Sequence, residues 1–346
     1  MTKSRKITYI VLFFVVAALF VLGGLYDLEI AHALYGPSNI MAQIFEGAGI
    51  FPPFLIWSVT FALLFFLIDP AKSRRVLKQV GCVAGMVASW FVFGYMAINE
   101  TSIEISWLPY VMGAIAAALF TPLTLYLVGR IEAEKKKKWL IFFGFASIVC
   151  ILSNIILVNL IKYIWGRPRF REMAAAGDFS IFANWYKING FTLHGHHSFP
   201  SGHTASAGAL FTFCALGEVF PEKREKEKST AFIVGLYTFT MAYSRIVLGA
   251  HFLSDVTAGF TISFLTYAVT RYIYFKTVGK QEAEAEAPAA IIEDAVPLDE
   301  PEGKVKGEPK GEKGEEQAAF EEKDGAEALP DEKPSAEEAE QGEENA

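Results

Sequence analysis

The chain has 346 residues, of which 52% are hydrophobic and 14% aromatic, and its formal net charge is −7. Ordinary soluble domains are less apolar than this, so a soluble globular protein is not the first interpretation of the composition. The charge is uneven, because the chain from Lys280 onward holds 23 acidic residues and seven lysines, a balance of −16, which leaves +9 for the rest. The three cysteines, Cys82, Cys150 and Cys214, lie in apolar runs and show neither a disulfide framework nor metal-ligand spacing.

Eight apolar runs follow one another along the chain. Most are close to the ~20 residues that cross a hydrocarbon core of ~30 Å. The run at 204–220 is shorter and rich in Ala, Gly and Ser, which suits close helix packing inside a membrane. The pattern predicts an all-α fold, a polytopic membrane helix bundle with about eight transmembrane helices. The runs are 7–25, 50–68, 80–98, 107–128, 139–161, 204–220, 230–248 and 254–275.

Basic residues occur in alternate loops. Lys and Arg cluster before the first run and after the second, fourth, sixth and eighth, whereas the loops 26–49 and 99–106 contain neither. By the positive-inside rule, both termini are expected in the cytoplasm and the segment 26–49 outside, as an interfacial helix or a loop. The first run could also be a signal peptide cleaved at 31–33, but its apolar core of about 19 residues is longer than usual and favours an uncleaved anchor.

The C-terminal segment differs in composition from the rest. It repeats Glu, Ala, Pro, Lys and Gly with few large apolar residues, so it cannot bury enough surface to fold alone. The chain is therefore expected to divide into three parts. Residues 1–138 hold about four N-terminal transmembrane helices, 139–276 hold a catalytic core with about four more, and 277–346 form a disordered acidic cytoplasmic tail.

Three polar clusters interrupt the apolar pattern at 162–169, 198–204 and 244–255, and the predicted topology brings all three to the outer face. Singly, each has a plain structural explanation, such as a lysine that extends to the headgroups or a satisfied His–Asp pair. Together they bring three cations, two histidines and a carboxylate to one side of the membrane. Phosphoryl transfer needs this combination, because its catalysis is mostly positioning and electrostatic stabilisation.

The second cluster has the features of a phosphate seat. Ser201 is suited to cap a helix whose free N–H groups would face an anion, and Gly202 permits close approach to the backbone. His203 exchanges a proton near neutral pH. In the third cluster, His251 and Asp255 lie one turn apart if 251–255 is helical, so that the carboxylate holds one ring nitrogen and leaves the other to attack phosphorus.

Three motifs in this order, Lys-x6-Arg, Pro-Ser-Gly-His and Ser-Arg-x5-His-x3-Asp, resemble those of the type 2 phosphatidic acid phosphatase superfamily, over about residues 139–275. The second and third motifs match in full. The first departs from the pattern, because Phe170 stands where the family has Pro. Arg167 precedes a Pro but lacks a Lys at the required spacing. We therefore expect Arg169 to be the ligand, with Arg167 as the alternative.

The resemblance implies a role for each matching residue. It makes His251 the nucleophile, Asp255 its orienting partner and His203 the general acid and base. It implies that hydrolysis requires no metal and no cofactor. It also implies a set of phosphate ligands, which are Lys162, Arg169, Ser201, Gly202 and Arg245.

These observations predict an integral-membrane lipid phosphatase of the cytoplasmic membrane, with its active site on the extracytoplasmic face. The expected partners are a lipid phosphate and the surrounding membrane lipids, with no nucleic acid. A phosphatidate-type glycerolipid and an isoprenoid diphosphate are both open as substrates. Two alternatives remain, a lipid phosphotransferase that uses the same site and a non-catalytic binder or transporter of lipid phosphate. His194, His196 and His197 could suggest zinc, but they lack an acidic partner and are expected to make loop or headgroup contacts.

Overall fold

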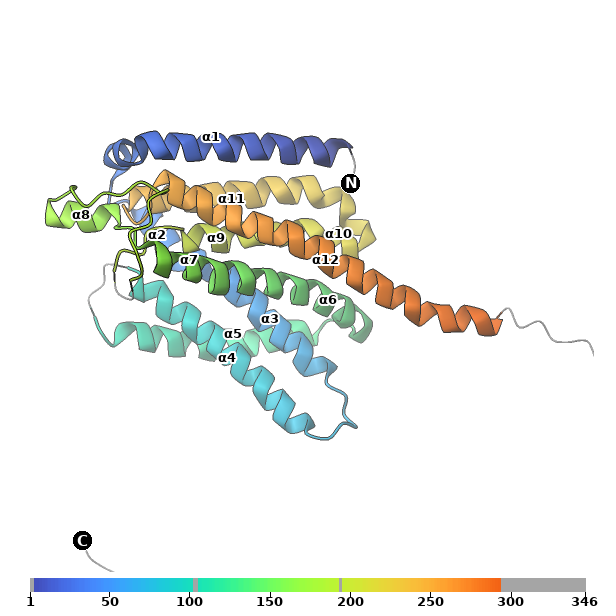
Figure 1. Ribbon diagram of the computed structural model, residues 1–346. Helices are drawn as coiled ribbons and strands as arrows, with labels where there is room; N and C mark the ends of the chain where they lie inside the picture. The colour runs from blue at the N-terminus through green and yellow to red at the C-terminus, as the bar shows by residue number, and fades with distance from the viewer. Residues whose placement is uncertain (1–2, 102–104, 193–194, 294–346) are drawn as a thin grey trace, which may run out of the picture. The chain divides into compact units, whose positions relative to one another are not determined.

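The computed structural model describes residues 3–101, 105–192 and 195–293, and every regular element in these ranges is a helix (Figure 1). Consecutive α-helices are linked in four places by short helical segments of another type. Three are 3-10 segments, η1 (Ala48–Ile50), η3 (Ala209–Ala215) and η4 (Pro221–Lys226), and one is π-helical, η2 (Ile151–Leu157). The α-helices are α1 (Lys3–Leu34), α2 (Ile40–Gly47), α3 (Phe51–Leu67), α4 (Arg75–Asn99), α5 (Leu108–Gly129), α6 (Ala133–Cys150), α7 (Val158–Trp165), α8 (Phe170–Ala176), α9 (Gly202–Gly208), α10 (Leu216–Val219), α11 (Glu227–Val247) and α12 (Leu253–Glu293).

Six stretches of the described chain are long and apolar enough to cross a membrane, so the prediction of an all-α membrane bundle is confirmed. Two of the eight expected crossings, 204–220 and 254–275, are not among the six. Both are helical, but the first is short and rich in small residues, and the second contains several Ser and Thr and an Arg. The six stretches are Ile7–Leu34, Ile40–Leu67, Arg75–Asn99, Leu108–Gly129, Ala133–Ala176 and Pro221–Val247.

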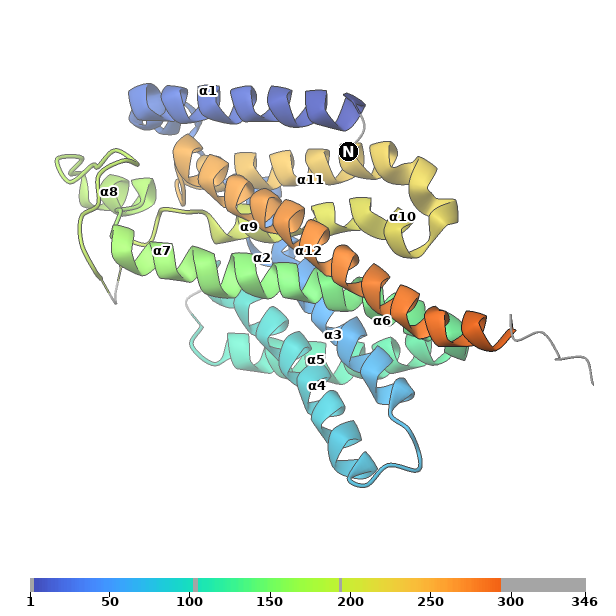
Figure 2. The same cartoon turned by 45° about the vertical axis from the view of Figure 1, so that its right-hand side comes forward.

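Large apolar side chains on the outside of the helices are consistent with a lipid environment. On α11, for example, Phe232 is 73% exposed and Phe239 is 69% exposed, a pattern that water would penalise and hydrocarbon would not. The loops after α3 and α5 and the segment η4 lie at the end of the bundle where α1 begins, and α8 lies at the opposite end (Figures 1 and 2). The basic loops thus share one end, while the orientation of that end in the membrane remains a prediction.

Small residues hold the start of α9 close against α12. A Cβ atom on Gly259 would lie 2.3 Å from the carbonyl oxygen of Ser201, so only glycine fits there, and one on Gly208 would lie 2.1 Å from Ser263 Oγ, so the Ser263 hydroxyl would have to rotate away. The Ser201 N–H donates to the Asp255 carbonyl oxygen across this contact, at 2.9 Å. The packing therefore brings the second and third sequence motifs together.

Two segment boundaries differ from those expected. Helix α1 continues through residues 26–34, where Ala31 is fully buried, and α2 follows after the N-cap of Asn39, whose side chain accepts from the Ala42 N–H at 2.9 Å. The segment 26–49 is thus part of the packed bundle. At the other end, α12 continues to Glu293 instead of ending near 276. The expected disordered tail beyond that point lies outside the described residues.

Candidate active site

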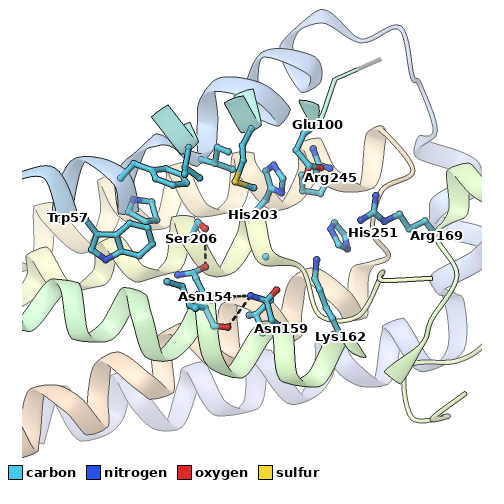
Figure 3. A pocket seen from close by; sticks show the side chains of 18 residues that line it. Trp57, Glu100, Asn154, Asn159, Lys162, Arg169, His203, Ser206, Arg245 and His251 are labelled. Atoms are coloured by element: carbon cyan, nitrogen blue, oxygen red, sulfur yellow. Dashed lines mark hydrogen bonds between the residues drawn. The ribbon is translucent and has the colours of Figure 1, made fainter. Parts of the chain in front are cut away.

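A cavity of about 300 Å³ lies among α3, α4, η2, α7, α9 and α11, and its lining includes side chains from all three predicted clusters (Figure 3). The cavity has a cationic end and a mainly apolar end. Figure 3 shows Trp57 far from Arg169, with His203 and Lys162 between them. The predicted site residues that line the cavity are Lys162, Arg169, Gly202, His203, Arg245 and His251.

The arginine side chains at the cationic end have unused hydrogen-bond donors. Arg245 is 1% exposed and donates through Nη2 to Glu46 Oε1 at 3.0 Å, but its Nε and Nη1 atoms are buried without a partner among the described residues. Arg169 Nε is also buried without a hydrogen bond and lies 4.0 Å from Glu172 Oε1. Buried donors on charged groups are costly to leave unpaired, so the unpaired N–H groups of Arg245 and Arg169 suit an anion with several oxygens.

The ring of His251 is held by a backbone carbonyl rather than by a carboxylate. His251 Nδ1 lies 2.6 Å from the Ser198 carbonyl oxygen and 3.8 Å from Asp255 Oδ2. A carbonyl oxygen only accepts, so Nδ1 carries the proton and Nε2 is left with its lone pair. Burial at this position, with the charge of Lys162 as a smaller cause, lowers the pKa of His251 to about 3 against the opposing effect of Asp255, so the ring is neutral at neutral pH.

The hydrogen bond expected between His251 and Asp255 is therefore absent from this pair, because α12 begins only at Leu253 and 251–252 are not helical. Asp255 supports His251 indirectly, through Ser198. Its Oδ2 accepts from Ser198 Oγ at 2.6 Å and from the Phe252 N–H at 2.8 Å. It thus fixes the loop residue whose carbonyl holds His251.

Arg167 is a structural residue of the same network and does not line the cavity. Its side chain is fully buried, and it donates through Nη1 to Asp255 Oδ1 at 2.5 Å and to Ser254 Oγ at 2.8 Å, and through Nη2 to Asp27 Oδ2 at 2.9 Å. The guanidinium also stacks over the Phe252 ring, 4.2 Å from its centroid. All these partners are protein groups, so the structure excludes Arg167 as the substitute ligand and leaves Arg169 in the cavity.

His203 is bound through the nitrogen farther from its backbone. Its Nε2 lies 3.0 Å from the Glu46 carbonyl oxygen, so this nitrogen carries a proton and the neutral ring has none on Nδ1. Burial lowers the pKa of His203 well below its usual value near 6.5, and the charge of Arg245 adds to this effect. Protonation on Nδ1 therefore requires either acidic pH or a bound anion that restores a higher pKa.

Ser201 and Gly202, predicted together as phosphate ligands, occupy different environments. Ser201 is fully buried and caps α9, with its Oγ accepting from the Thr204 N–H at 3.3 Å and from Thr204 Oγ1 at 3.0 Å, and it does not line the cavity. Gly202 does line it, and a Cβ there would lie 3.8 Å from Lys162 Nζ. The capping role expected for Ser201 is present, whereas direct contact with the ligand would fall to Gly202.

Phe170 departs from the family pattern without disturbing the backbone. It is the first residue of α8, preceded by Arg169 in an extended conformation (φ −85°, ψ 150°) as the N-cap. Proline is favoured at this helix position because its fixed φ is already helical, and other residues adopt the same geometry. Phe170 is 1% exposed and instead fills an aromatic cluster with Phe252 and Phe179.

The loop histidines lie away from the cavity. His197 Nε2 lies 3.1 Å from the Thr192 carbonyl oxygen, and His196 Nδ1 lies 3.2 Å from Glu172 Oε2, whereas His194 is outside the described residues. Within the described ranges, no three His, Cys, Asp or Glu side chains gather as a metal site would require. The requirement for a metal or a cofactor is not decided by this observation, and the expectation of none remains a prediction.

Two acidic residues of the site were missed by sequence reasoning, which assigned their segments to outer loops. Glu46 is 3% exposed and accepts from Arg245 and from Arg171 Nη1, each at 3.0 Å. Glu100, at the end of α4, lines the cavity. A carboxylate in a segment without Lys or Arg, opposite a cluster of cations, is the signal that could have indicated both.

Comparisons with known proteins find relatives over the same part of the chain. The model of the PAP2 superfamily matches residues 143–278. The chain is 31% identical to the lipid A 4'-phosphatase of Rhizobium etli over 162 residues, 46% of this chain and 59% of that protein. It is 29% identical to the lipid A 1-phosphatase of Rhizobium johnstonii over 155 residues, 42% of this chain and 57% of that protein. It is 32% identical to phosphatidylglycerophosphatase B of Bacillus subtilis over 76 residues, 21% of this chain and 37% of that protein.

Each of these matches spans less than two thirds of the relative's own length. No solved structure was found to match this chain. The matched segment nevertheless contains every predicted catalytic and phosphate-binding residue, from Lys162 to Asp255. The PAP2 domain match over residues 143–278 therefore confirms the predicted resemblance to the type 2 phosphatidic acid phosphatase superfamily.

Proposed function

We propose that the protein is an integral-membrane phosphatase that hydrolyses a phosphomonoester or diphosphate of a lipid at the extracytoplasmic face of the cytoplasmic membrane. One observation carries the proposal. Unpaired guanidinium donors of Arg169 and Arg245 line the same cavity as Lys162 and the two buried imidazoles of His203 and His251. The cations suit the charge on a transferring phosphoryl group, and the imidazoles suit the nucleophile and the general acid.

The reaction follows from the protonation states of the two rings. The Nε2 lone pair of His251 attacks phosphorus while its Nδ1–H remains bound to the Ser198 carbonyl oxygen. The bond between phosphorus and the lipid oxygen breaks, and protonated His203 gives a proton to that oxygen. Water then attacks the phosphohistidine, His203 takes a proton from it, and the bond between phosphorus and Nε2 breaks to release inorganic phosphate.

The membrane bundle and the relatives support a lipid as the substrate. The cavity continues from the cations to apolar side chains of α3 and α4, which include Phe54 and Val92. The relatives named above are phosphatases of lipid A and of phosphatidylglycerophosphate. A soluble phosphoester would make no use of the apolar half of the cavity.

The test of the proposed function is phosphate release from a panel of lipids by the purified full-length protein in detergent with a metal chelator present. The panel contains phosphatidate, a prenyl diphosphate and a soluble phosphomonoester. We expect release from at least one of the lipids and about 10-fold or greater preference for it over the soluble ester. Binding of lipid phosphate without release would instead favour a non-catalytic binder, and label appearing in a second lipid would identify a phosphotransferase.

The depressed pKa of His203 predicts a sloping pH profile. A general acid must carry its proton before the reaction, and the pKa of this group in the free protein lies well below 6.5, so its protonated fraction falls as pH rises. We expect kcat/KM to fall by about 10-fold per pH unit between pH 6.5 and 8.5. His203→Gln should be slower and should remove this slope; the same slope in the variant would assign the proton to another group.

A further inference from the structure

The half of the cavity away from the cations contains polar groups that the phosphoryl chemistry does not use. They are Trp57 on α3, Asn154 on η2, Asn159 on α7 and Ser206 on α9. Figure 3 shows Ser206, Asn154 and Asn159 between Trp57 and Lys162. Polar side chains inside membrane helices are costly and face a bundle interior or a cavity, so this group needs an explanation of its own.

The two asparagines are oriented by hydrogen bonds within the protein. Asn154 Oδ1 accepts from Ser206 Oγ at 2.9 Å, and its Nδ2 donates one hydrogen to Ser153 Oγ at 3.1 Å. Asn159 Nδ2 donates to the carbonyl oxygens of Asn154 at 3.2 Å and of Ile155 at 3.0 Å. An amide that faces two carbonyls must present its nitrogen to them, which fixes the flip of the Asn159 side chain.

Three hydrogen-bonding positions remain for a ligand. Trp57 Nε1 is buried and has no partner among the described residues. Asn154 Nδ2 keeps its second hydrogen, and Asn159 Oδ1 keeps its acceptor sites, since only the bonds named above involve these amides within the described chain. The residues that line the cavity thus keep two unused donors and one acceptor.

The spacing along the helix places these groups below the phosphate site. Asn159 precedes Lys162 by one α-helical turn, about 4.5 Å along the axis at 1.5 Å per residue, and Asn154 lies about one further turn back, in the π-helical segment η2. Ile155 and Val158 lie on the same face and also line the cavity. A lipid whose phosphate contacts Lys162 would therefore run past Asn159 first and then past Asn154 and Trp57.

The opposite wall comes from helices outside the PAP2 domain. Phe54 and Trp57 on α3, and Val92 and Met96 on α4, line the cavity and precede residue 143. The domain supplies the phosphate site, whereas the N-terminal helices supply most of the apolar wall and the unpaired indole N–H. Helices that lie well before the motifs in sequence therefore contribute to the choice of lipid.

We propose that this half of the cavity binds the ester, amide or hydroxyl groups that join the phosphate-bearing part of an acylated lipid to its chains. The proposal rests on the phosphatase function above and selects between the two lipid classes that the sequence left open. A carbonyl oxygen satisfies the Trp57 and Asn154 donors. A prenyl chain is hydrocarbon beyond its phosphates and would leave these donors unpaired in a dry cavity, which a site built for hydrogen bonding rejects strongly.

The experiment compares phosphatidate with its diether analogue of the same chain lengths, which keeps the phosphate and the hydrocarbon but lacks the carbonyls. Phosphate release by the full-length protein gives kcat/KM for each. We expect the wild type to prefer the diester by about 3- to 10-fold, the effect of one or two neutral hydrogen bonds. Asn154→Leu and Trp57→Phe should bring this ratio close to one. A prenyl diphosphate should be a poorer substrate than phosphatidate.

Thr240→Val is the matched polar-to-apolar control. Thr240 is half-buried on α11, donates to the Leu236 carbonyl oxygen of its own helix at 2.9 Å and does not line the cavity, so the diester preference should persist. A ratio near one in the wild type, or a ratio unchanged in both cavity variants, would overturn the proposal and would indicate that water fills these positions. Hydrolysis of the prenyl diphosphate in preference to phosphatidate would also overturn it. If the wild type released phosphate from none of the lipids, the proposed function itself would fail.

Discussion

Replacement of His251 by Ala should reduce phosphate release by about 10⁴-fold or more, because loss of a covalent nucleophile removes the route through which both steps pass. The structure gives the reason in atomic terms. The Ser198 carbonyl oxygen holds Nδ1 at 2.6 Å, so the other nitrogen, Nε2, is unprotonated and His251 lines the cavity that also contains Lys162. The pKa of about 3 keeps the ring neutral throughout the neutral range, so no deprotonation step precedes the attack.

The measurement is phosphate release from the best lipid of the panel, together with chemical trapping of the labelled protein after rapid quenching. A phosphohistidine is stable to alkali and labile to acid, whereas a phosphorylated carboxylate is labile to alkali. We expect alkali-stable label in the wild type and none in His251→Ala. His196→Ala is the matched control, since His196 is exposed and lies outside the cavity, and it should retain activity and label. Activity in His251→Ala above about one tenth of the wild type would remove His251 from the nucleophile role.

Arg167→Ala should lose stability, whereas Arg169→Ala should lose catalytic activity, although the two residues are separated by a single proline. Removal of Arg167 leaves the Asp27 and Asp255 carboxylates, both at most 2% exposed, without their shared counter-ion. The cost of breaking such a buried ion pair is about 3–5 kcal/mol of unfolding free energy. Removal of Arg169 deletes an Nε donor that makes no hydrogen bond and loses only the 4.0 Å contact with Glu172, so the fold should persist while kcat/KM falls by about 100-fold, the value of one or two charged hydrogen bonds.

Thermal unfolding in detergent and kinetics of phosphate release separate the two effects. Arg167→Ala should lower the midpoint temperature strongly, and its activity should fall with the folded fraction. Arg169→Ala should unfold close to the wild-type temperature. Asp27→Asn tests the same network from the other side and should destabilise the protein without a change in KM of the folded fraction. A stable Arg167→Ala variant with weakened substrate binding would show that this arginine contacts the substrate.

Much of this site could be predicted from short patterns in the sequence. The pair of histidines, the third cation at Arg245 and the small-residue run after Gly202 were all predicted from residue types and spacing within short segments. The asparagines at 154 and 159 share a helix face with Lys162, and two polar residues within an apolar run are a detectable signal that the motif search did not use. The expected His251–Asp255 hydrogen bond failed for a local reason as well, because the helix starts two residues too late.

The amino-acid order alone was sufficient to establish a helical membrane bundle, since the length of an apolar run decides whether it crosses the bilayer, and to name the cations that line the cavity, since the motifs lie within single segments. It could not assign Arg167 and Arg169 to different roles, find Asp27 as the acidic partner of Arg167 and Glu46 as that of Arg245, or show that α3 and α4 wall the cavity. Those features join residues as far as 140 and 199 positions apart. Such contacts depend on which helix faces pack together, and that arrangement follows from the shape and burial of the whole bundle rather than from any one segment.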